Sequence, residues 1–362
     1  MKKVSLLLVI LLSICSLTVY AETTEDSSME METAIVLEAG DIIEAEEFDG
    51  GYQNVKLKIT SGKYKNKIIN VRNDLSLNFA YDIVVKQGDK VIVSVEEIEE
   101  GNIEVFITDY MRQHYIFYLT IVFILLIIII GKTKGLKAVV TLTITVFAIM
   151  KVLLPMMLKG ANPIPITILI SIGITIITIF VVGGINNKSI SAILGTSGGV
   201  LIAGLIAYFI GSKVKLTGLS SDEAMMLAYI PQKVSFDFKN LLFSGIILGS
   251  LGAVMDVGMS ISSAIDEIHN ANSNITRKDL FTSGMNVGKD IMGTMTNTLI
   301  LAYTGSTIPM LLLFMAYETS MIKIINLDII ATEVIRSLAG SIGLVLTIPL
   351  TAFIASVLIK RK

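Results

Sequence analysis

One stretch decides the fold. It runs from Gly245 to Thr304 and reads GIILGSLGAVMDVGMSISSAIDEIHNANSNITRKDLFTSGMNVGKDIMGTMTNTLILAYT. Two apolar runs flank a short polar turn, so we expect two membrane helices joined as a hairpin over residues 241–315. Polar groups lie inside both runs, with Asp256 in the first and Asn297 among threonines in the second. A charge or an amide is costly in hydrocarbon, so such residues usually face a partner or a water-filled path. We therefore expect this hairpin to be the functional centre.

Residues three and four apart share one face of a helix. On the first helix this spacing aligns three glycines with a polar series, and on the second it aligns an aspartate, a threonine and an asparagine. Two interpretations of Asp256 stay open. It couples transport to a proton or an ion, or it accepts hydrogen bonds from Asn297 and Thr294 and locks the helices together. The candidate residues are the packing glycines Gly245, Gly249 and Gly252 and the polar residues Asp256, Ser260, Ser263, Asp290, Thr294 and Asn297.

The composition indicates a membrane protein that crosses the bilayer several times. Hydrophobic residues make up 53% of the chain, charged residues only 17%, and the mean hydropathy is +0.74. A single cysteine excludes an internal disulfide, and two distant histidines argue against a metal site. We expect no cofactor, no nucleic-acid partner and no enzymatic activity, because no nucleophile lies beside a convincing base. The expected partners are the lipid bilayer and other membrane proteins, in a homo-oligomer or a hetero-oligomer.

The N-terminus is typical of an exported protein. Lys2 and Lys3 precede an apolar run that ends near Ala21, which predicts a signal peptide over residues 1–21. An uncleaved signal anchor is the alternative. From Glu22 to Asp49 there are eleven acidic residues and no basic ones, which we interpret as a solvated acidic linker.

Short alternating segments follow between about residue 33 and residue 109. Val55–Ile59 alternates between apolar and polar residues, and 90–95 and 103–107 are also strand-like. Glycine-containing turns separate them. This pattern predicts a small antiparallel β domain, closed or nearly closed as a barrel, within residues 22–112. Without a cluster of catalytic groups, this domain is expected to bind a partner or to gate a path.

Residues 113–362 are predicted to be the membrane domain. The short loop after the first span carries Lys132, Lys134 and Lys137 without an acid, and the positive-inside rule places it in the cytoplasm. The β domain is then outside the cell, and the C-terminal cations are inside. External segments are expected at 211–239, with a helix that Ser221 caps and Pro231 stops, and at 317–336. The seven predicted spans are 115–130, 138–158, 164–182, 190–210, the two arms of the hairpin, and 337–359.

The hairpin also carries a family resemblance. LGAVMDVGMSISSAIDEI followed by LFTSGMNVGKDIMGTMTNTLILAYTGSTIPMLLL resembles the YibE/F-like family of bacterial multi-pass membrane proteins. The resemblance implies a protein of the bacterial cytoplasmic membrane and implies no activity. A weaker likeness links the glycine-rich helix with its aspartate to the membrane halves of SecD/SecF and RND exporters, whose intramembrane carboxylates serve proton coupling. On that analogy Asp256 carries the proton, although this chain has one small outer domain and no second half.

Transport or export, coupled to protons through Asp256, is therefore the expected function. The alternative is a non-transporting scaffold or accessory subunit whose outer β domain binds a partner. Transport predicts that water reaches Asp256, whereas the scaffold predicts a dry and fully paired Asp256.

Overall fold

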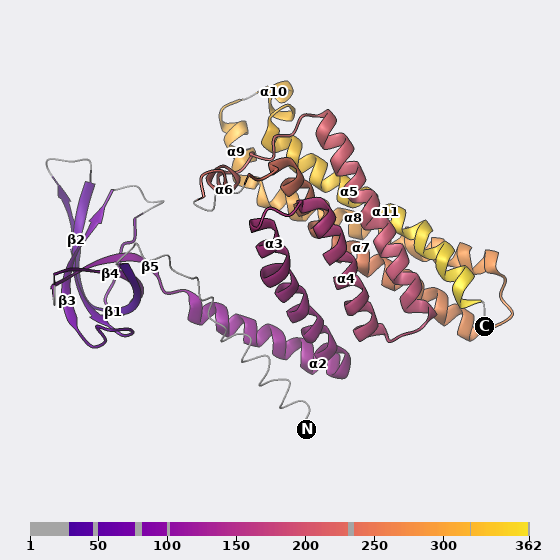
Figure 1. The fold of residues 1–362 in the computed structure, drawn as a ribbon, viewed down its shortest axis with the longest axis horizontal. Coiled ribbons are helices and arrows are strands. Elements are labelled where there is room, and N and C mark those ends of the chain that lie inside the picture. Colours follow the sequence, from indigo (N-terminus) through magenta and orange to yellow (C-terminus); the bar gives the residue numbers. More distant parts are fainter. Residues whose placement is uncertain are drawn as a thin grey trace. The chain divides into compact units, whose positions relative to one another are not determined.

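The computed structural model of this chain describes residues 29–45, 50–76, 82–99, 102–230, 235–318 and 320–360. It divides into two compact units, Met1–Leu126 and Ile127–Lys362, each described by itself below (Figure 1). Three predictions fall outside the described residues: the signal peptide at 1–21, the helix stop at Pro231, and the last two cations, Arg361 and Lys362.

The first unit contains a five-stranded antiparallel sheet in the order β3-β2-β1-β4-β5. β1 is long enough to pair with β4 through residues 29–35 and with β2 through residues 34–45. Irregularities after Val36 and Ala39 shift the register with β2, and such bulges bend a strand. The strands are β1 (Met29–Ala45), β2 (Gly50–Ile59), β3 (Ile68–Leu75), β4 (Lys90–Glu99) and β5 (Asn102–Tyr110).

Alternate residues of each strand build the core of this sheet. Val55, Leu57 and Ile59 of β2 are buried, while the residues between them are more exposed, as the two-residue period of a strand requires. The edge strands β3 and β5 approach each other without pairing, so the described strands form a half-barrel. The predicted antiparallel β domain is confirmed. The predicted closure is not, because no hydrogen-bonded ladder joins β3 to β5 in the described strands.

The acidic-linker interpretation is wrong from Met29 onward. That segment is β1, the central strand of the sheet, and Glu32 is only 3% exposed within it. Glu32 lies on the same face of the strand as the buried Ala34 and Val36, so the negative charge concealed a strand period.

The membrane helices begin with α2 (Gln113–Ala148), which continues through η1 (Ile149–Leu153) and α3 (Leu154–Leu158). Together they span 46 residues, or about 70 Å of helix, whereas the hydrocarbon core of a bilayer is about 30 Å thick. The backbone breaks at Lys132, where φ is 49°, and a side chain at Gly135 would collide with the carbonyl group of Ile127. The break therefore lies in the basic loop that was predicted between the first two spans.

Five helices, or six if one bent pair counts as a single span, are long and apolar enough to cross a membrane in the described part of the chain. α5 and α7 pack against α11 at the centre of the second unit, with α4 and α8 beside them (Figure 1). The prediction of seven spans requires that α2 to α3 cross twice, and it stays a prediction. The remaining helices are α4 (Pro163–Gly183), α5 (Asn187–Lys213), α6 (Asp222–Leu227), α7 (Phe238–Ala271), α8 (Arg277–Ser306), α9 (Ile308–Ala316), α10 (Met321–Ile325) and α11 (Asp328–Ile359).

The loops of the second unit gather at two opposite ends of its helices. At one end, Asn187 donates to the carbonyl oxygen of Leu358 over 2.8 Å, and the ammonium group of Lys360 donates to the carbonyl oxygen of Ile275. At the other end, the hydroxyl of Thr217 donates to Asp328 over 2.6 Å. The α4–α5 turn, the α7–α8 turn and the end of α11 thus share one side, as the predicted topology requires.

Two boundaries in the second half of the chain differ from expectation. α11 begins at Asp328, inside the predicted external segment 317–336, and Glu333 and Arg336 pair one helical turn apart within it, with an N–O distance of 2.6 Å. The second arm of the hairpin ends at Ser306 and bends by 60° into α9. Pro309 has no backbone N–H, and its ring would collide with the carbonyl group of Gly305 in a continuous helix, which accounts for the break.

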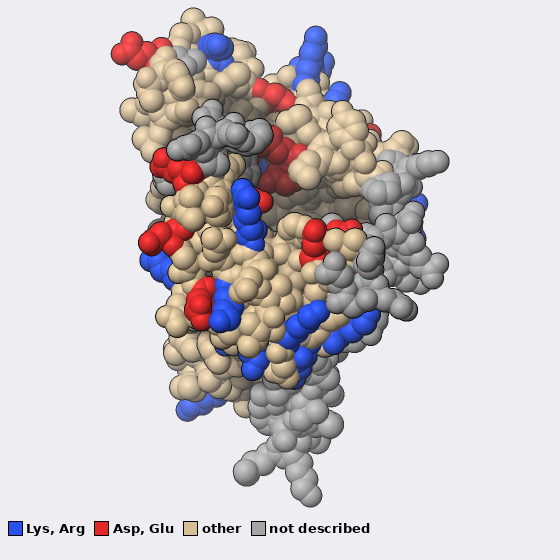
Figure 2. Space-filling view, turned by 90° about the vertical axis from the view of Figure 1, so that its left-hand side faces the viewer, with Lys and Arg blue, Asp and Glu red and all other residues tan. Residues whose placement is uncertain are grey.

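The short helix α6 was predicted correctly at its start. The side chain of Ser221 accepts a hydrogen bond from the backbone N–H of Ala224, as an N-cap does. The surface carries few charges elsewhere. Figure 2 shows acidic and basic side chains on the same face, separated by wide areas without charge.

Candidate intramembrane site on α7 and α8

α7 has two faces of opposite character. Val254, Val257 and Ile261 are fully buried on one face, where the helix packs against α5 and α11. The opposite face is exposed and carries the predicted stripe. At 3.6 residues per turn the two series fall about half a turn apart. The exposed stripe consists of Gly245, Gly249, Gly252, Asp256, Ser260 and Glu267, with Ser263 half-buried beside them.

Asp256 lies close to the middle of α7. It is 18 residues from the first residue of the helix and 15 from the last, or about 27 Å and 22 Å along the axis. Its side chain is exposed and forms no hydrogen bond or ion pair with any described residue. Of its expected partners, Thr294 donates its hydroxyl to the carbonyl oxygen of Ile291 over 2.9 Å instead. The predicted lock between Asp256, Asn297 and Thr294 is therefore absent from the described chain.

α8 repeats this arrangement. Leu280, Gly284 and Gly288 face the interior, where a side chain at Gly284 would press on Ile265 and one at Gly288 on Ile348. Asp290, Thr294 and Asn297 are exposed on the other side. Five of the six predicted polar residues of the two helices thus lie on exposed faces, and Ser263 is half-buried.

Two of the three α7 glycines predicted to pack meet no other helix within the described chain. A Cβ atom at Gly245 or Gly252 would meet nothing within 4 Å in the described structure. Gly249 alone makes a close contact, since a Cβ atom there would lie 2.7 Å from the hydroxyl of Tyr303. The close packing occurs instead at Gly195 and Gly199, the GxxxG pair of α5, which rest on Thr351 and Thr347 of α11.

Tyr303 introduces a polar cluster that the sequence did not reveal. A cavity of about 280 Å³ lies between α8, α9 and α11, and Tyr303, Thr304 and Glu333 line it. One carboxylate oxygen of Glu333 binds Arg336, and the other is buried without a partner among the described residues. The sequence signal that could have indicated this cluster was the pair of opposite charges at positions 333 and 336. We interpreted these charges as part of an external segment.

Charged groups also mark the opposite end of α7. Lys188 at the start of α5 lies 3.7 Å from Asp266, and both side chains are mostly buried. Glu267, Asp290 and Ser263 lie on the same part of the hairpin. Polar groups therefore occur at intervals along α7 and α8, from the Tyr303 cavity past Asp256 to the α7–α8 turn.

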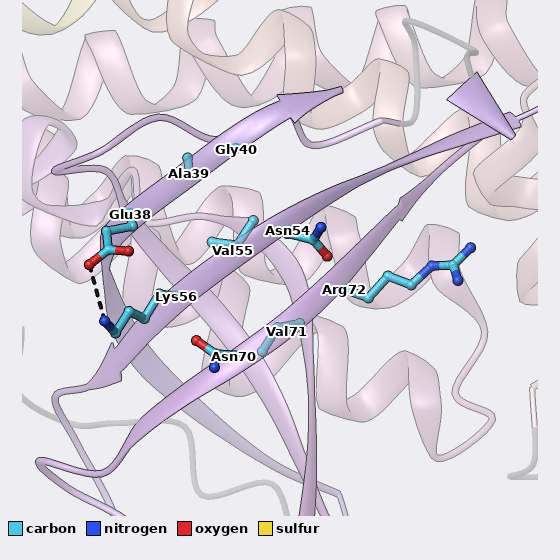
Figure 3. Close-up of a pocket in the computed structure, with 9 residues that line it drawn as sticks. All are labelled: Glu38, Ala39, Gly40, Asn54, Val55, Lys56, Asn70, Val71 and Arg72. Carbon is cyan, nitrogen blue, oxygen red and sulfur yellow. Dashed lines mark hydrogen bonds and ion pairs between the residues drawn. The ribbon is translucent and has the colours of Figure 1, made fainter. Parts of the chain in front are cut away.

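The β domain has a separate hollow of about 670 Å³ on the exposed side of β1, β2 and β3. Figure 3 shows Glu38 and Lys56 joined across it, with an N–O distance of 3.0 Å, while Arg72 points away from them. Arg72 instead binds Asp74 over 2.8 Å and lies over the ring of Tyr52. The charges of this hollow are thus paired, which suits a shallow binding surface better than a catalytic centre.

No group of three or more metal-ligating side chains exists in the part of the chain that the structure describes. Asp109 of the β domain accepts hydrogen bonds from Arg112 and from the backbone N–H of Tyr110, and these bonds hold the pKa of its carboxyl below the usual range. Burial raises the pKa of the Tyr110 phenol, whose hydroxyl donates to the carbonyl oxygen of Val84 over 2.5 Å.

Comparison with protein families accounts for both units of the chain. Residues 119–361 match the model described as YibE/F-like protein, and residues 43–110 match the YibE/F family N-terminal domain. The chain belongs to the YibE/F-like family. The family resemblance of the hairpin is thereby confirmed. The YibE/F N-terminal match begins inside β1, so the pairing of β1 with β4 lies outside it. Neither the curated proteins nor the solved structures provide a match to this YibE/F-like chain.

Proposed function

We propose that this protein transports or exports a solute across the bacterial cytoplasmic membrane, and that Asp256 takes up and releases a proton during transport. The observation that carries this proposal is the position of Asp256, halfway along α7 and without a bonding partner in the described chain. A carboxylate that only tied helices together would bind a donor from a neighbouring helix. An unpaired intramembrane acid is typical of a proton or ion pathway.

The polar groups above and below Asp256 support the same proposal. Tyr303 contacts Gly249, which is seven residues, or about 10 Å, from Asp256 along α7. Tyr303 also borders the cavity that contains the unpaired oxygen of Glu333. In the other direction, Ser260 and Ser263 lead toward Asp266 and the α7–α8 turn. Under this proposal a proton moves along this series by short steps.

The rest of the molecule fits around this path in the proposed arrangement. The β domain lies outside the cell and the C-terminus in the cytoplasm, and the chain has no enzymatic activity of its own. The alternative function, an accessory subunit that binds a partner through its β domain, is favoured by the hollow between Glu38 and Arg72. In that case Asp256 needs no proton exchange.

The first experiment uses cells from which the chromosomal gene for this protein has been deleted. These cells carry the unchanged protein (the parent), Asp256→Asn, Asp256→Glu or the surface control Asp222→Asn. Untargeted mass spectrometry and elemental analysis of cells and medium report which compounds each protein moves. Transport predicts at least one compound whose distribution depends on the parent, is lost with Asp256→Asn, and is restored in part by Asp256→Glu. A fully active Asp256→Asn protein refutes the proton-carrier role, and no parent-dependent compound refutes transport.

A second experiment needs no substrate. Dicyclohexylcarbodiimide reacts with protonated carboxyl groups in apolar surroundings, and mass spectrometry locates the adduct on the purified full-length protein. We expect labelling at Asp256 that decreases as the pH rises and that is absent in Asp256→Asn. An absence of labelling at every pH contradicts proton uptake by this residue.

A further inference from the structure

We propose that a second copy of this chain covers the exposed face of α7 and α8, and that it supplies the hydrogen-bonding partners that Asp256 lacks in its own chain. This inference goes beyond the proposed function, which rests on the lack of partners for Asp256 within its own chain, because it concerns the groups that Asp256 meets between chains.

The face cannot be a lipid-facing surface of the ordinary kind. Exposed large apolar side chains are frequent on α2, α4 and α5, with Leu169 70% exposed and Leu205 54% exposed. Between residues 238 and 299, all of which the structure describes, no large apolar side chain is exposed. Glycine, serine, threonine, asparagine and aspartate take their place. Polar side chains within a bilayer almost always face other protein or water.

The shape of the face permits a close approach by another helix. A Cβ atom at Gly245 or Gly252 would meet nothing within 4 Å, and Ser260 continues the same line of small residues. Gly252 also borders a cavity of about 290 Å³ whose other walls come from α2, η1 and α4 of the same chain. Small residues let two backbones come near enough for van der Waals contact and hydrogen bonds between membrane helices. The glycines that do not pack within this chain are thus available for packing between chains.

The chemistry of the face is self-complementary. Asp256 offers acceptors, while the amide of Asn297 and the hydroxyl of Ser260 offer donors that bind no described residue. Two copies inserted in the same direction are related by an axis along the membrane normal, so groups meet only at equal depth. The contact between Tyr303 and Gly249 sets that depth. Asp256 lies seven residues after Gly249 on α7, and Thr296 lies seven residues before Tyr303 on the antiparallel α8. Asp256 is therefore at the same depth as Thr296, which is next to Asn297. A donor of one copy therefore meets the acid of the other.

Cysteine cross-linking of the full chain in cell membranes tests the proposal. In a Cys15→Ser background, Gly245→Cys, Gly252→Cys and Ser260→Cys are oxidised one at a time, with Leu169→Cys on α4 and Leu205→Cys on α5 as exposed controls. We expect at least one position of the α7 stripe to give a product of twice the monomer mass, and neither control to do so. The proposal is overturned if none of the three positions on the α7 stripe gives a dimer product. It is also overturned by a cross-linked product of any other mass, which would identify a different protein as the partner.

Side-chain replacements then test the complementarity. In the cross-linking variant, Asp256→Asn keeps an acceptor and is expected to retain the dimer product, whereas Asp256→Leu and Asn297→Ala reduce it several-fold. The thermal stability of each variant in detergent shows that the chain is folded. Equal cross-linking in all three variants refutes the role of these groups, and transport that persists in Asp256→Asn with an intact dimer refutes only the proposed function.

Discussion

Glycine positions show why single residues need the structure for their interpretation. Gly199 and Gly245 both occur in apolar helices with glycines nearby, yet only Gly199 lies against another helix in the described chain. A Cβ atom at Gly199 would lie 2.9 Å from the backbone carbonyl oxygen of Gly343 and 3.0 Å from Val254. The sequence identifies glycines that can pack, but which helix faces them depends on the whole bundle.

The replacement Gly199→Ala is therefore expected to destabilise the membrane domain. Overpacking a tight site costs about 1–3 kcal/mol, and here the contact includes backbone that cannot move aside. Gly173→Ala on α4 is the matched control, because a Cβ atom there meets nothing within 4 Å. Alanine also favours a helix over glycine by about 1 kcal/mol. Thermal unfolding in detergent should show a lower melting temperature for Gly199→Ala and an unchanged or higher one for Gly173→Ala. An unchanged melting temperature for Gly199→Ala would show that α5 and α11 have room between them.

Asp109 makes the β domain sensitive to acid. Its pKa is lowered in the folded state by the bonds from Arg112 and from the backbone N–H of Tyr110. A carboxyl with a lowered folded pKa stabilises the fold above its unfolded pKa, and this contribution is lost as the pH falls through the folded value. We expect the melting temperature of the domain to drop below about pH 4, near the ordinary pKa of aspartate. Asp109→Asn should lessen that drop, and an identical pH profile in the variant would contradict the assignment.

Among the candidate residues, Asp256 was identifiable because a lone carboxylate in an apolar run is conspicuous in any sequence. The side chains that surround Asp256 could not be identified from the sequence. The proposed partners Asn297 and Thr294 share the correct helical face, but rotation of α8 points that face away from the bundle. Tyr303 was missed because a tyrosine near a helix end resembles an interfacial anchor.

Secondary-structure elements were predictable where apolar periodicity was strong. The first residues of α4, α5 and α7 lie within a few positions of the expected ones, since asparagine or aspartate caps begin these helices. β1 and β3 were not recognised. In β1, the acidic Glu32 occupies an inner position beside Ala34 and Val36, and the charge of the segment dominated the interpretation.

The central position of β1 gives a direct test of the β domain. Residues 29–112 expressed alone should be soluble and unfold cooperatively, because the five strands bury a common core. Residues 50–112, which lack β1, should fail to fold, because β2 and β4 both lose the strand between them. Circular dichroism and thermal unfolding distinguish the two. A disordered 29–112 fragment would mean that the domain folds only with the membrane part.

At the scale of the whole molecule, the class of protein followed from composition, and the alternation of loops followed from the order of the spans. The α4–α5 turn, the α7–α8 turn and the end of α11 share one end of the bundle, as the predicted topology requires. The number of crossings depends on Lys132, where α2 breaks. Hydropathy alone could not locate this break, because apolar residues extend on both sides of the three lysines.

The orientation of the chain can be tested at two exposed lysines, Lys86 in the β domain and Lys134 in the basic loop. Cysteine is introduced at one or the other in a Cys15→Ser background, and intact cells are treated with a thiol reagent that does not cross the cytoplasmic membrane. The positive-inside rule assigns Lys134 to the cytoplasm and, with one crossing between them, Lys86 to the outside. We expect labelling at position 86 in intact cells and at position 134 only after the cells are lysed. If α2 and α3 formed one continuous crossing, the break at Lys132 would lie at membrane depth, and position 134 would stay unlabelled even in lysed cells. Equal labelling of both positions in intact cells would place both outside and contradict the predicted crossing between them.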